Sequence, residues 1–573
     1  MEAQSERKAG LLLHTSSFPD AEDIIGNPGP GGRRLLDFMQ SASLKVLQVL
    51  PMGPIGAGNS PYASFSAFAL EPLFLSLADL ERDGYVSADQ RAAFLEQLTN
   101  ANRVDFGILF QFKRRLLLEN LHGEQLSSAQ SVESYSEFCF EEHHWLHDYA
   151  LFMALRYHYQ EKPWFEWPTE HRDRRLIQGI PAFLQQSYEQ QCFLQWLMHT
   201  QWSSFRNAAN QRGIEIMGDC PIFVSHDSAD VWAHPELFML NEHLELDFVA
   251  GVPPDYFSET GQRWGNPLYD WPVHQQQGYD WWSRRLARQA DLFDSLRIDH
   301  FRGFDEYWAI PASSPDARQG SWQPGPGKAF FDAMQEQAGM PLIIAEDLGI
   351  ITDTVRELLG STGLPGMRVF EFAPWSEGGF HRTQQWHSIL EHDYIPESWP
   401  RNCIGYAGTH DNNTFQGWYD EMQPLERYHF FKYLGMLDSR LQQVAARIAG
   451  LENQFDALQR MLPVESGNLI IEQGVQRSEV LLQEAYQTRD QILDQTEWPA
   501  KAPFEECMQR ILESESMLVI IAMQDVLGLG ANERMNTPGT SGDHNWSWRL
   551  DPDIILDATL ADKISRWIAS SHR

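Results

Sequence analysis

The run SLRIDHF, residues Ser295–Phe301, sets the pattern that decides the fold, because a short strand-like stretch ends there in charged and polar side chains. Similar short apolar runs recur along the chain; they are GLLLHTSS (Gly10–Ser17), LKVLQVLP (Leu44–Pro51), IEIMGDCPIFV (Ile214–Val224), PLIIAED (Pro341–Asp347), MRVFEF (Met367–Phe372), CIGYAGTHD (Cys403–Asp411) and MLVIIAMQD (Met517–Asp525). Such runs are typical of strands buried on both faces of a parallel sheet. Amphipathic helical stretches such as Asp280–Phe293 and Lys328–Ala338 separate many of them. The sequence therefore predicts an α/β fold, a (β/α)8 TIM barrel.

The connections between the predicted strands differ greatly in length, which indicates insertions into one catalytic barrel at residues 8–550. Residues 52–213, between strands two and three, are too long for a simple crossover and predict a helical subdomain. Residues 225–294, between strands three and four, include the Gly- and Pro-rich segment Gly251–Trp271, which predicts an active-site loop insertion. Too few residues follow the eighth strand for a C-terminal β domain.

Between strands seven and eight, apolar residues alternate at spacings of four and three from Leu437 to Leu462, which is a heptad pattern. A second, weaker pattern runs from Ile471 to Ile492. We expect a helical hairpin at residues 437–495. Two arrangements stay open: an antiparallel coiled pair that projects from the barrel, and two ordinary helices packed on its wall. The projecting pair would offer a surface for self-association.

The bulk composition excludes several classes of partner. The 573-residue chain carries 44 basic and 79 acidic residues, a formal net charge of −35, which disfavours nucleic acid and anionic membranes. The N-terminus lacks the apolar core of a signal peptide, and the five cysteines include no CxxC pair. These features favour a reducing, cytoplasmic setting and predict no metal site. Aromatic residues make up 12% of the chain, and those in loops offer flat faces for sugar rings.

Carboxylates end two neighbouring predicted strands. Asp299 ends the fourth strand, and Arg297 should point the same way because alternate residues of a strand share a face. A cation beside a carboxylate favours its ionised form, which nucleophilic attack on an anomeric carbon requires. Glu346 ends the fifth strand among apolar neighbours and near another anion. That environment raises the pKa of a carboxyl group and suits a general acid.

Two further carboxylates extend this set. Asp411 follows His410 at the end of the seventh strand, and Asp219 lies in the polar break of the third. A single acidic residue at a strand end is commonly a cap or a salt-bridge partner. Four of them around one barrel mouth would be costly to bury unless a function held them there. Retaining glycosidases use such a set, with the reacting pair about 5–5.5 Å apart.

Several segments resemble a known family. RIDHFRG (Arg297–Gly303), IAEDLG (Ile344–Gly349) and GTHDNNT (Gly408–Thr414) are similar to the catalytic segments of glycoside hydrolase family 77, the amylomaltases or disproportionating enzymes. The other similar segments are GNSPYASFSAFA (Gly58–Ala69), residues 251–271 and QDVLGLGANERMNTPGT (Gln524–Thr540). The resemblance implies a 4-α-glucanotransferase without a cofactor. Its donors would be malto-oligosaccharides and other α-1,4-glucans, and its acceptors glucose or another glucan.

The resemblance also implies roles for individual residues. Asp299 would be the nucleophile, Glu346 the acid/base, and Asp411 a third carboxylate that fixes sugar hydroxyls. The residues expected to bind substrate or to support the reacting groups are Tyr62, Asp219, Trp264, Arg297, His410 and Asn536, of which Trp264 would lie on a loop that closes over the glucan.

Two other functions stay open from the sequence. An α-amylase-like retaining hydrolase would use the same carboxylates with water as the acceptor. The flanking segments of the resemblance and the missing C-terminal β domain favour transfer over hydrolysis. A non-catalytic glucan-binding scaffold, with the hairpin as its interaction surface, is the remaining alternative, and the intact carboxylate set argues against it.

Overall fold

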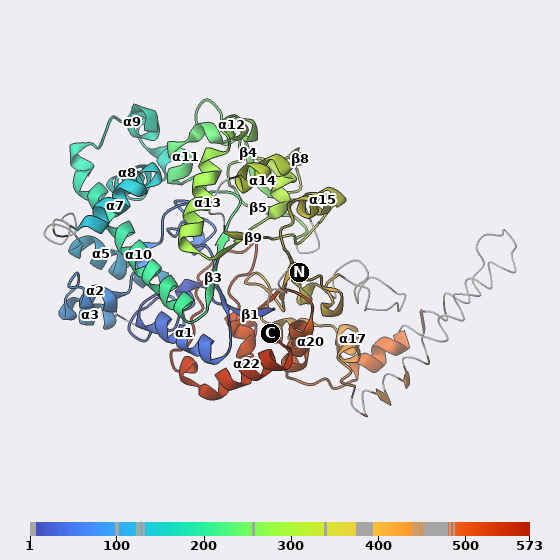
Figure 1. The fold of residues 1–573 in the computed structure, drawn as a ribbon. Coiled ribbons are helices and arrows are strands. Elements are labelled where there is room, and N and C mark those ends of the chain that lie inside the picture. The colour runs from blue at the N-terminus through green and yellow to red at the C-terminus, as the bar shows by residue number, and fades with distance from the viewer. Residues whose placement is uncertain are drawn as a thin grey trace, which may run out of the picture.

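The structure is a computed structural model of the chain, drawn as a ribbon in Figure 1. Its described residues are 7–97, 102–121, 132–254, 258–336, 341–373, 393–437 and 487–573, with isolated residues at 128 and between 439 and 484.

Eight parallel strands form the central sheet; they are β1 (Lys8–Leu12), β2 (Val46–Gln48), β3 (Glu215–Cys220), β6 (Ser295–Ile298), β9 (Leu342–Ala345), β10 (Gly366–Val369), β11 (Cys403–Tyr406) and β12 (Leu518–Ala522). Neighbours pair in the order β10-β11-β12-β1-β2-β3-β6-β9, and every pair is parallel. The Ala345 N–H donates to the Pro365 carbonyl at 2.9 Å, which brings β9 against the start of β10 and nearly closes the ring. Each predicted apolar run overlaps one of these strands, so the (β/α)8 barrel is confirmed.

Most residues of the barrel strands are buried, as continuous apolar runs require. Every residue of β6, β11 and β12 is buried. Helices on the outside of the ring present one apolar face to these strands. In α20 (Phe504–Glu513), buried residues recur at positions i, i+3, i+4, i+7 and i+8, counted from Phe504. This spacing places them on one side of the helix.

The other helices between barrel strands have their apolar faces on the same core. They are α1 (Pro30–Ser41), α10 (Gln185–Gln211), α13 (Asp280–Leu292), α14 (Lys328–Gln335), α15 (Asp353–Thr362), α16 (Phe415–Glu421) and α17 (Pro424–Leu434). The two expected helical stretches correspond to α13 and α14. After β12 come α21 (Met523–Val526) and α22 (Ala558–Ser570), and residues 523–573 contain no strand. Among the described residues, no helix has the length and apolarity to cross a lipid bilayer.

Helices fill the connection between β2 and β3 and lie to one side of the barrel (Figure 1). They are α2 (Leu77–Arg82), α3 (Ala88–Leu95), α4 (Phe106–Ile108), α5 (Arg114–Asn120), α7 (Glu133–Glu141), α8 (His143–His158) and α9 (Thr169–Arg172), followed by α10. The tryptophans of this region are buried; they are Trp145, Trp164, Trp167, Trp196 and Trp202. These rings therefore form the core of the connection.

A second, four-stranded sheet lies beside the barrel, and two of its strands fall in the segment for which the sequence predicts a loop. Its strands are β4 (Phe248–Val252), β5 (Gln262–Arg263), β7 (Glu306–Pro311) and β8 (Ser321–Pro324), all antiparallel in the order β5-β4-β7-β8. The strands are short, and a Cβ on Gly251 would lie 2.2 Å from the Gln262 carbonyl. The glycine that indicates a loop is thus required by close strand packing.

Most residues of the predicted hairpin at residues 437–495 lie outside the described residues. The hairpin and its role in self-association therefore stay predictions. The preceding helix α17 ends at Leu434, and Gly435 caps it in the left-handed conformation, with φ of 71°. At the far end of the segment, Leu493 is buried against Tyr428.

A buried ion pair joins the long connection to the loop after β1. Lys113 Nζ, in the π-helical turn η4 (Leu109–Lys113), donates to Asp23 Oδ2 at 2.5 Å, and both side chains are inaccessible to solvent. Removing one partner of such a pair leaves a buried charge uncompensated. The pair should therefore hold the helical connection against the barrel.

We predict that Lys113→Met lowers the free energy of unfolding by about 3–5 kcal/mol. The double variant Asp23→Asn/Lys113→Met should recover most of that loss, because neither member of the pair is then left charged without the other. Urea unfolding followed by tryptophan fluorescence measures both. The control is Arg115→Ala, which removes an exposed i, i+4 pair with Glu119 and should cost about 0.5 kcal/mol or less. Equal losses in Lys113→Met and Arg115→Ala would contradict the role of the buried pair.

Candidate active site

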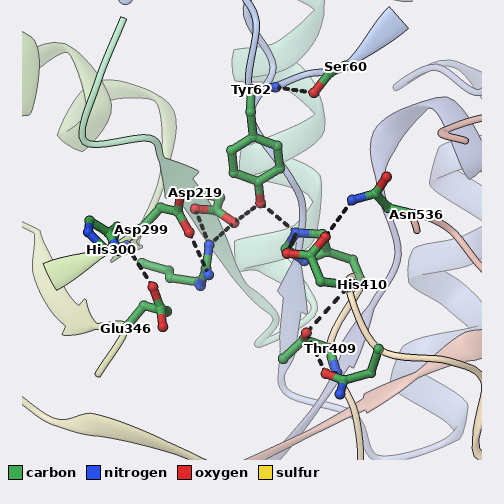
Figure 2. A network of polar contacts seen from close by, with 12 residues as sticks. Ser60, Tyr62, Asp219, Asp299, His300, Glu346, Thr409, His410 and Asn536 are labelled. Carbon is green, nitrogen blue, oxygen red and sulfur yellow. Dashed lines mark hydrogen bonds and ion pairs between the residues drawn. The ribbon is translucent and has the colours of Figure 1, made fainter. Parts of the chain in front are cut away.

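The expected carboxylates converge at the C-terminal end of the barrel, and Figure 2 shows Asp219, Asp299 and Glu346 among them. Asp219 lies in β3, Asp299 follows β6, Glu346 follows β9, and Asp411 lies beyond the end of β11. Because the strands are parallel, their carboxyl ends meet at one rim of the ring. The structure thus brings together side chains that are distant in the sequence.

Arg297 is the central cation of this rim. In the register of β3 and β6 it lies opposite Asp219, and its Nη1 donates to both oxygens of that carboxylate at 2.8 and 2.7 Å. Its Nη2 donates to Asp299 Oδ1 at 2.8 Å. The Arg297 side chain is only 5% exposed, that of Asp219 is fully buried and that of Asp299 is 29% exposed. Arg297 therefore fixes one buried and one accessible carboxylate in relation to each other.

The two acids raise the pKa of Arg297 well above its ordinary value, even though burial alone would lower it. Its positive charge is therefore retained throughout the physiological range. This is the arrangement expected from the sequence, in which Arg297 and Asp299 share one face of a strand.

Glu346 lies beside Asp299 because the ladder between β6 and β9 continues beyond the strands. Its N–H donates to the Ile298 carbonyl, and its carbonyl accepts from the Phe301 N–H, each at 3.1 Å. Its carboxyl oxygens accept the N–H groups of His300 at 2.7 Å and Leu348 at 2.9 Å. The acid is thus held on both its backbone and its side chain.

The surroundings of Glu346 favour its protonated form. Burial, the largest contribution, raises the pKa of Glu346 to about 8, with a further contribution from the negative charge of Asp299. The nearby Arg297 and the two backbone N–H groups oppose this shift without cancelling it. At neutral pH this side chain can therefore donate a proton.

Asp411 is held in the opposite charge state. Desolvation by the surrounding protein would by itself raise its pKa, but the His410 ring and the Asn536 amide stabilise the carboxylate and lower the pKa below the usual range for aspartate. Asn536 Nδ2 donates to Asp411 Oδ1 at 2.6 Å, and His410 Nε2 lies 3.3 Å from Oδ2. The Asp411 side chain is 45% exposed, so an ionised carboxylate faces the mouth of the barrel.

Tyr62 joins the two halves of the rim. Its hydroxyl donates to Asp219 Oδ2 at 2.8 Å and lies 2.9 Å from His410 Nε2, and its ring stacks on the His410 ring at a centroid distance of 5.4 Å. One unbroken chain of polar contacts therefore runs from Asp299 through Arg297 to Asp411.

Trp264 lies at the edge of the rim, just beyond β5. Its indole is 38% exposed and meets the His300 ring edge to face, with centroids 5.0 Å apart. Its Nε1 donates to Gln262 Oε1 at 3.2 Å. A large aromatic face is thus accessible near Glu346, the acid to which His300 donates.

Sequence reasoning missed two residues of this site. His300 adopts the left-handed conformation, with φ of 51°, while its N–H donates to Glu346. Arg534 donates through Nη2 to the Asp411 carbonyl and through Nε to the Asn536 carbonyl, each at 2.5 Å. Both lie inside segments of the family resemblance, but nothing about their residue types indicates these backbone contacts.

No group of three or more His, Cys, Asp or Glu side chains among the described residues has the arrangement of a metal site. The chemistry available at the rim is that of a protonated acid, an accessible aspartate fixed by arginine, and an ionised third carboxylate. A (β/α)8 barrel with these groups at its C-terminal end is the arrangement of enzymes that act on glycosidic bonds.

Comparison with known proteins places the chain within that class. The profile of glycoside hydrolase family 77, described as 4-alpha-glucanotransferase, matches residues 13–555, and the chain belongs to this family. It is 38% identical over 551 residues to a 4-alpha-glucanotransferase of Thermus thermophilus, with 95% of each chain covered. It is 35% identical to the chloroplastic and amyloplastic 4-alpha-glucanotransferase of Arabidopsis thaliana, over 97% of this chain and 83% of the relative.

Solved structures give the same result. The amylomaltase of Streptococcus agalactiae, in complex with acarbose, superposes with a TM-score of 0.78 at 30% identity and covers 99% of this chain and 100% of its own. The amylomaltase of Corynebacterium glutamicum, at 18% identity and a TM-score of 0.70, shares the fold over 98% of this chain and 75% of its own.

We predict that Arg297→Lys lowers kcat/KM on a malto-oligosaccharide by about 100-fold or more. One ammonium cannot reproduce the hydrogen bonds that the two guanidinium nitrogens donate to Asp219 and Asp299. Initial rates measure the loss, and thermal unfolding verifies that the variant is folded. Arg284→Lys is the matched control, since Arg284 forms an exposed pair with Asp280 and should be neutral. Wild-type turnover in Arg297→Lys would show that the two hydrogen-bonding nitrogens of Arg297 are not needed to position Asp299.

Proposed function

We propose that this protein is a 4-α-glucanotransferase that moves α-1,4-glucan segments between chains by a retaining double displacement. The carrying observation is that Glu346, whose raised pKa favours the protonated form, lies beside an accessible Asp299 that Arg297 fixes in place. Family membership and relatives named 4-alpha-glucanotransferase support the same activity.

In the first half-reaction, an Asp299 carboxylate oxygen attacks the anomeric carbon of the donor glucan. The glycosidic C–O bond breaks, and Glu346 gives its proton to the leaving oxygen, which departs as a free 4-hydroxyl. A covalent glycosyl-enzyme remains on Asp299. Arg297 contacts Oδ1 of Asp299 and so orients the attacking group.

In the second half-reaction, Glu346 is a carboxylate and accepts the proton of an incoming sugar 4-hydroxyl. The acceptor oxygen attacks the anomeric carbon, and the ester bond to Asp299 breaks. Two inversions retain the configuration. A pKa of about 8 suits both duties, because Glu346 can hold the proton before the first step and take it back in the second.

Asp411 has a different role in this mechanism. It is ionised, and its exposed oxygens face the mouth of the barrel, where they would accept hydrogen bonds from sugar hydroxyls and stabilise the positive charge of an oxocarbenium-like transition state. Asn536 and His410 hold it in place, and Tyr62 links His410 to Asp219. We assign Tyr62, Asp219 and Asn536 to the donor side of the site.

The substrates follow from these groups. We infer malto-oligosaccharides and longer α-1,4-glucans as donors, and glucose or a glucan end as acceptor. The accessible face of Trp264 would stack on a sugar ring of the bound chain. The five cysteines are free thiols, which fits a reducing compartment such as the cytoplasm.

We predict an alkaline limb in the pH profile. Glu346 must be protonated in the first half-reaction, so kcat/KM should fall about tenfold per pH unit once the pH rises through about 8. Initial rates of glucose release from maltotriose between pH 5.5 and 9.5 measure this limb. Thermal unfolding at pH 9 separates titration from loss of structure. A flat profile up to pH 9.5 in a folded enzyme would remove Glu346 from the role of acid.

We also predict the products from pure maltotriose. Glucose together with maltopentaose and longer chains should form, because sugar captures the intermediate. Asp299→Asn should lower this transfer by at least about 1,000-fold without changing the melting temperature by more than a few degrees, since the side chain keeps its shape. Chromatography that separates the products by size distinguishes transfer from hydrolysis. Glucose and maltose alone, with rising reducing ends, would instead identify a hydrolase.

A further inference from the structure

Two buried acidic side chains flank the loop that carries His410 and Asp411. Glu371 lies in the 3-10 turn η10 (Phe370–Phe372) after β10, and Asp525 lies in α21 after β12. In the barrel, β11 lies between β10 and β12, so one acid stands on each side of the loop that follows β11. The Glu371 residue is 2% exposed and Asp525 3%.

The two acids contact opposite ends of this loop. At its start, the Glu371 N–H donates to the Ala407 carbonyl at 3.0 Å, and a Cβ on Gly408 would lie 2.7 Å from Glu371 Oε1. The carboxyl group thus lies directly against the backbone of Gly408. At its end, Asp525 Oδ1 accepts the Phe415 N–H at 2.7 Å. Residues 407–415 are therefore fastened from both neighbouring strands.

We propose that Glu371 and Asp525 are positioning residues that hold the 407–415 loop between them and thereby set the position of Asp411, with Glu371 acting as an uncharged acid. This rests on the proposed function, in which Asp411 stabilises the transition state. Neither residue lies in the chain of contacts from Asp299 to Asp411, so both act on the reacting groups indirectly, through the 407–415 loop.

The uncharged state of Glu371 follows from its surroundings. Its Oε1 is buried and has no hydrogen-bond partner among the described residues, and an isolated carboxylate in such a place is very costly. Burial, together with the charges of Asp525 and Glu421, raises the pKa of Glu371 well above its usual range, and the nearby cation Arg534 does not cancel that shift. Burial likewise raises the pKa of Asp525 to about 7.

A charge on Glu371 would act on the catalytic loop through Arg534. That guanidinium donates to the carbonyls of Asp411 and Asn536, and its positive charge also acts on Glu371. The Cys507 thiol of α20 also interacts electrostatically with Glu371, and burial raises the pKa of that thiol. A carboxylate at position 371 would draw Arg534 away from Asp411, whereas a neutral acid leaves it in place.

The charge state is tested by the stability of Glu371→Gln, which keeps the shape of the acid without its charge. A carboxyl group whose pKa is raised on folding destabilises the folded state increasingly as the pH rises above its unfolded pKa of about 4.3. The melting temperature of Glu371→Gln minus that of the wild type should therefore grow by at least about 2 °C between pH 5 and pH 8. Glu397→Gln, at an exposed pair with Arg510, should show no such growth. A difference that stays constant or shrinks with pH would mean that Glu371 is charged in the folded protein.

The positioning role is tested by turnover of maltotriose at pH 6.5. Glu371→Ala and Asp525→Ala should lower kcat about 10- to 100-fold with KM changed less than about threefold. Glu371→Gln and Asp525→Asn should keep at least about half of the wild-type kcat, because the amide oxygen introduced by Asp525→Asn could still accept the Phe415 N–H. Folded alanine variants with wild-type kcat, or amide variants as impaired as the alanine variants, would overturn the proposal.

Gly408→Ala provides an independent arm. Its new Cβ would meet the Glu371 carboxyl, so kcat should fall. Glu371→Ala removes that clash, so the kcat of the double variant Gly408→Ala/Glu371→Ala should be about tenfold higher than the value obtained by multiplying the two single effects. Strict multiplicativity would show that Glu371 does not set the loop. A wild type that only hydrolyses maltotriose would refute the proposed transfer, and the melting comparison would still decide the state of Glu371.

Discussion

The contact of Arg297 with two carboxylates is the interaction on which the mouth of the barrel depends. Asp219 is fully buried, and leaving it ionised without a partner would cost more than most single contacts in a protein can offset. A planar guanidinium can satisfy both oxygens of Asp219 and still direct a second nitrogen at Asp299. Because the three residues stand on adjacent strands, the register of β3 and β6 determines where the reacting carboxylate lies.

Around this cation, one rim holds acids in opposite states of protonation. Glu346 is desolvated by its surroundings, faces the charge of Asp299 and accepts two backbone N–H groups, so the neutral form prevails. Asp411 is contacted by His410 and Asn536, so the charged form prevails. The residue types are nearly equivalent, and their environments assign the roles.

The amino-acid sequence predicts the barrel well because its strands are local, continuous apolar runs, and it predicts the main acids because they stand where those runs end. The second sheet could not be predicted in this way. β4 pairs with β7, which lies beyond a barrel strand, and Gly251 is there for close packing against Gln262. Such pairing is not visible in a local pattern.

The same limit applies to the site: nothing in the residue type of His300 indicates a left-handed backbone that directs its N–H at Glu346. Strand ends can be read from a sequence, whereas the protonation of a buried acid such as Glu371 requires the assembled surroundings.

The rim is assembled from segments at both ends of the chain, so its residues depend on partners that are distant in the sequence. Asp411 depends on Asn536 from the C-terminal part and, through His410, on Tyr62 from the N-terminal part. Tyr62 in turn shares Asp219 with Arg297. Each side chain therefore has partners on both sides, so removing one changes the environment of two others. Contributions of single residues along such a chain are not additive, and the rim acts as one unit whose geometry is set by the barrel.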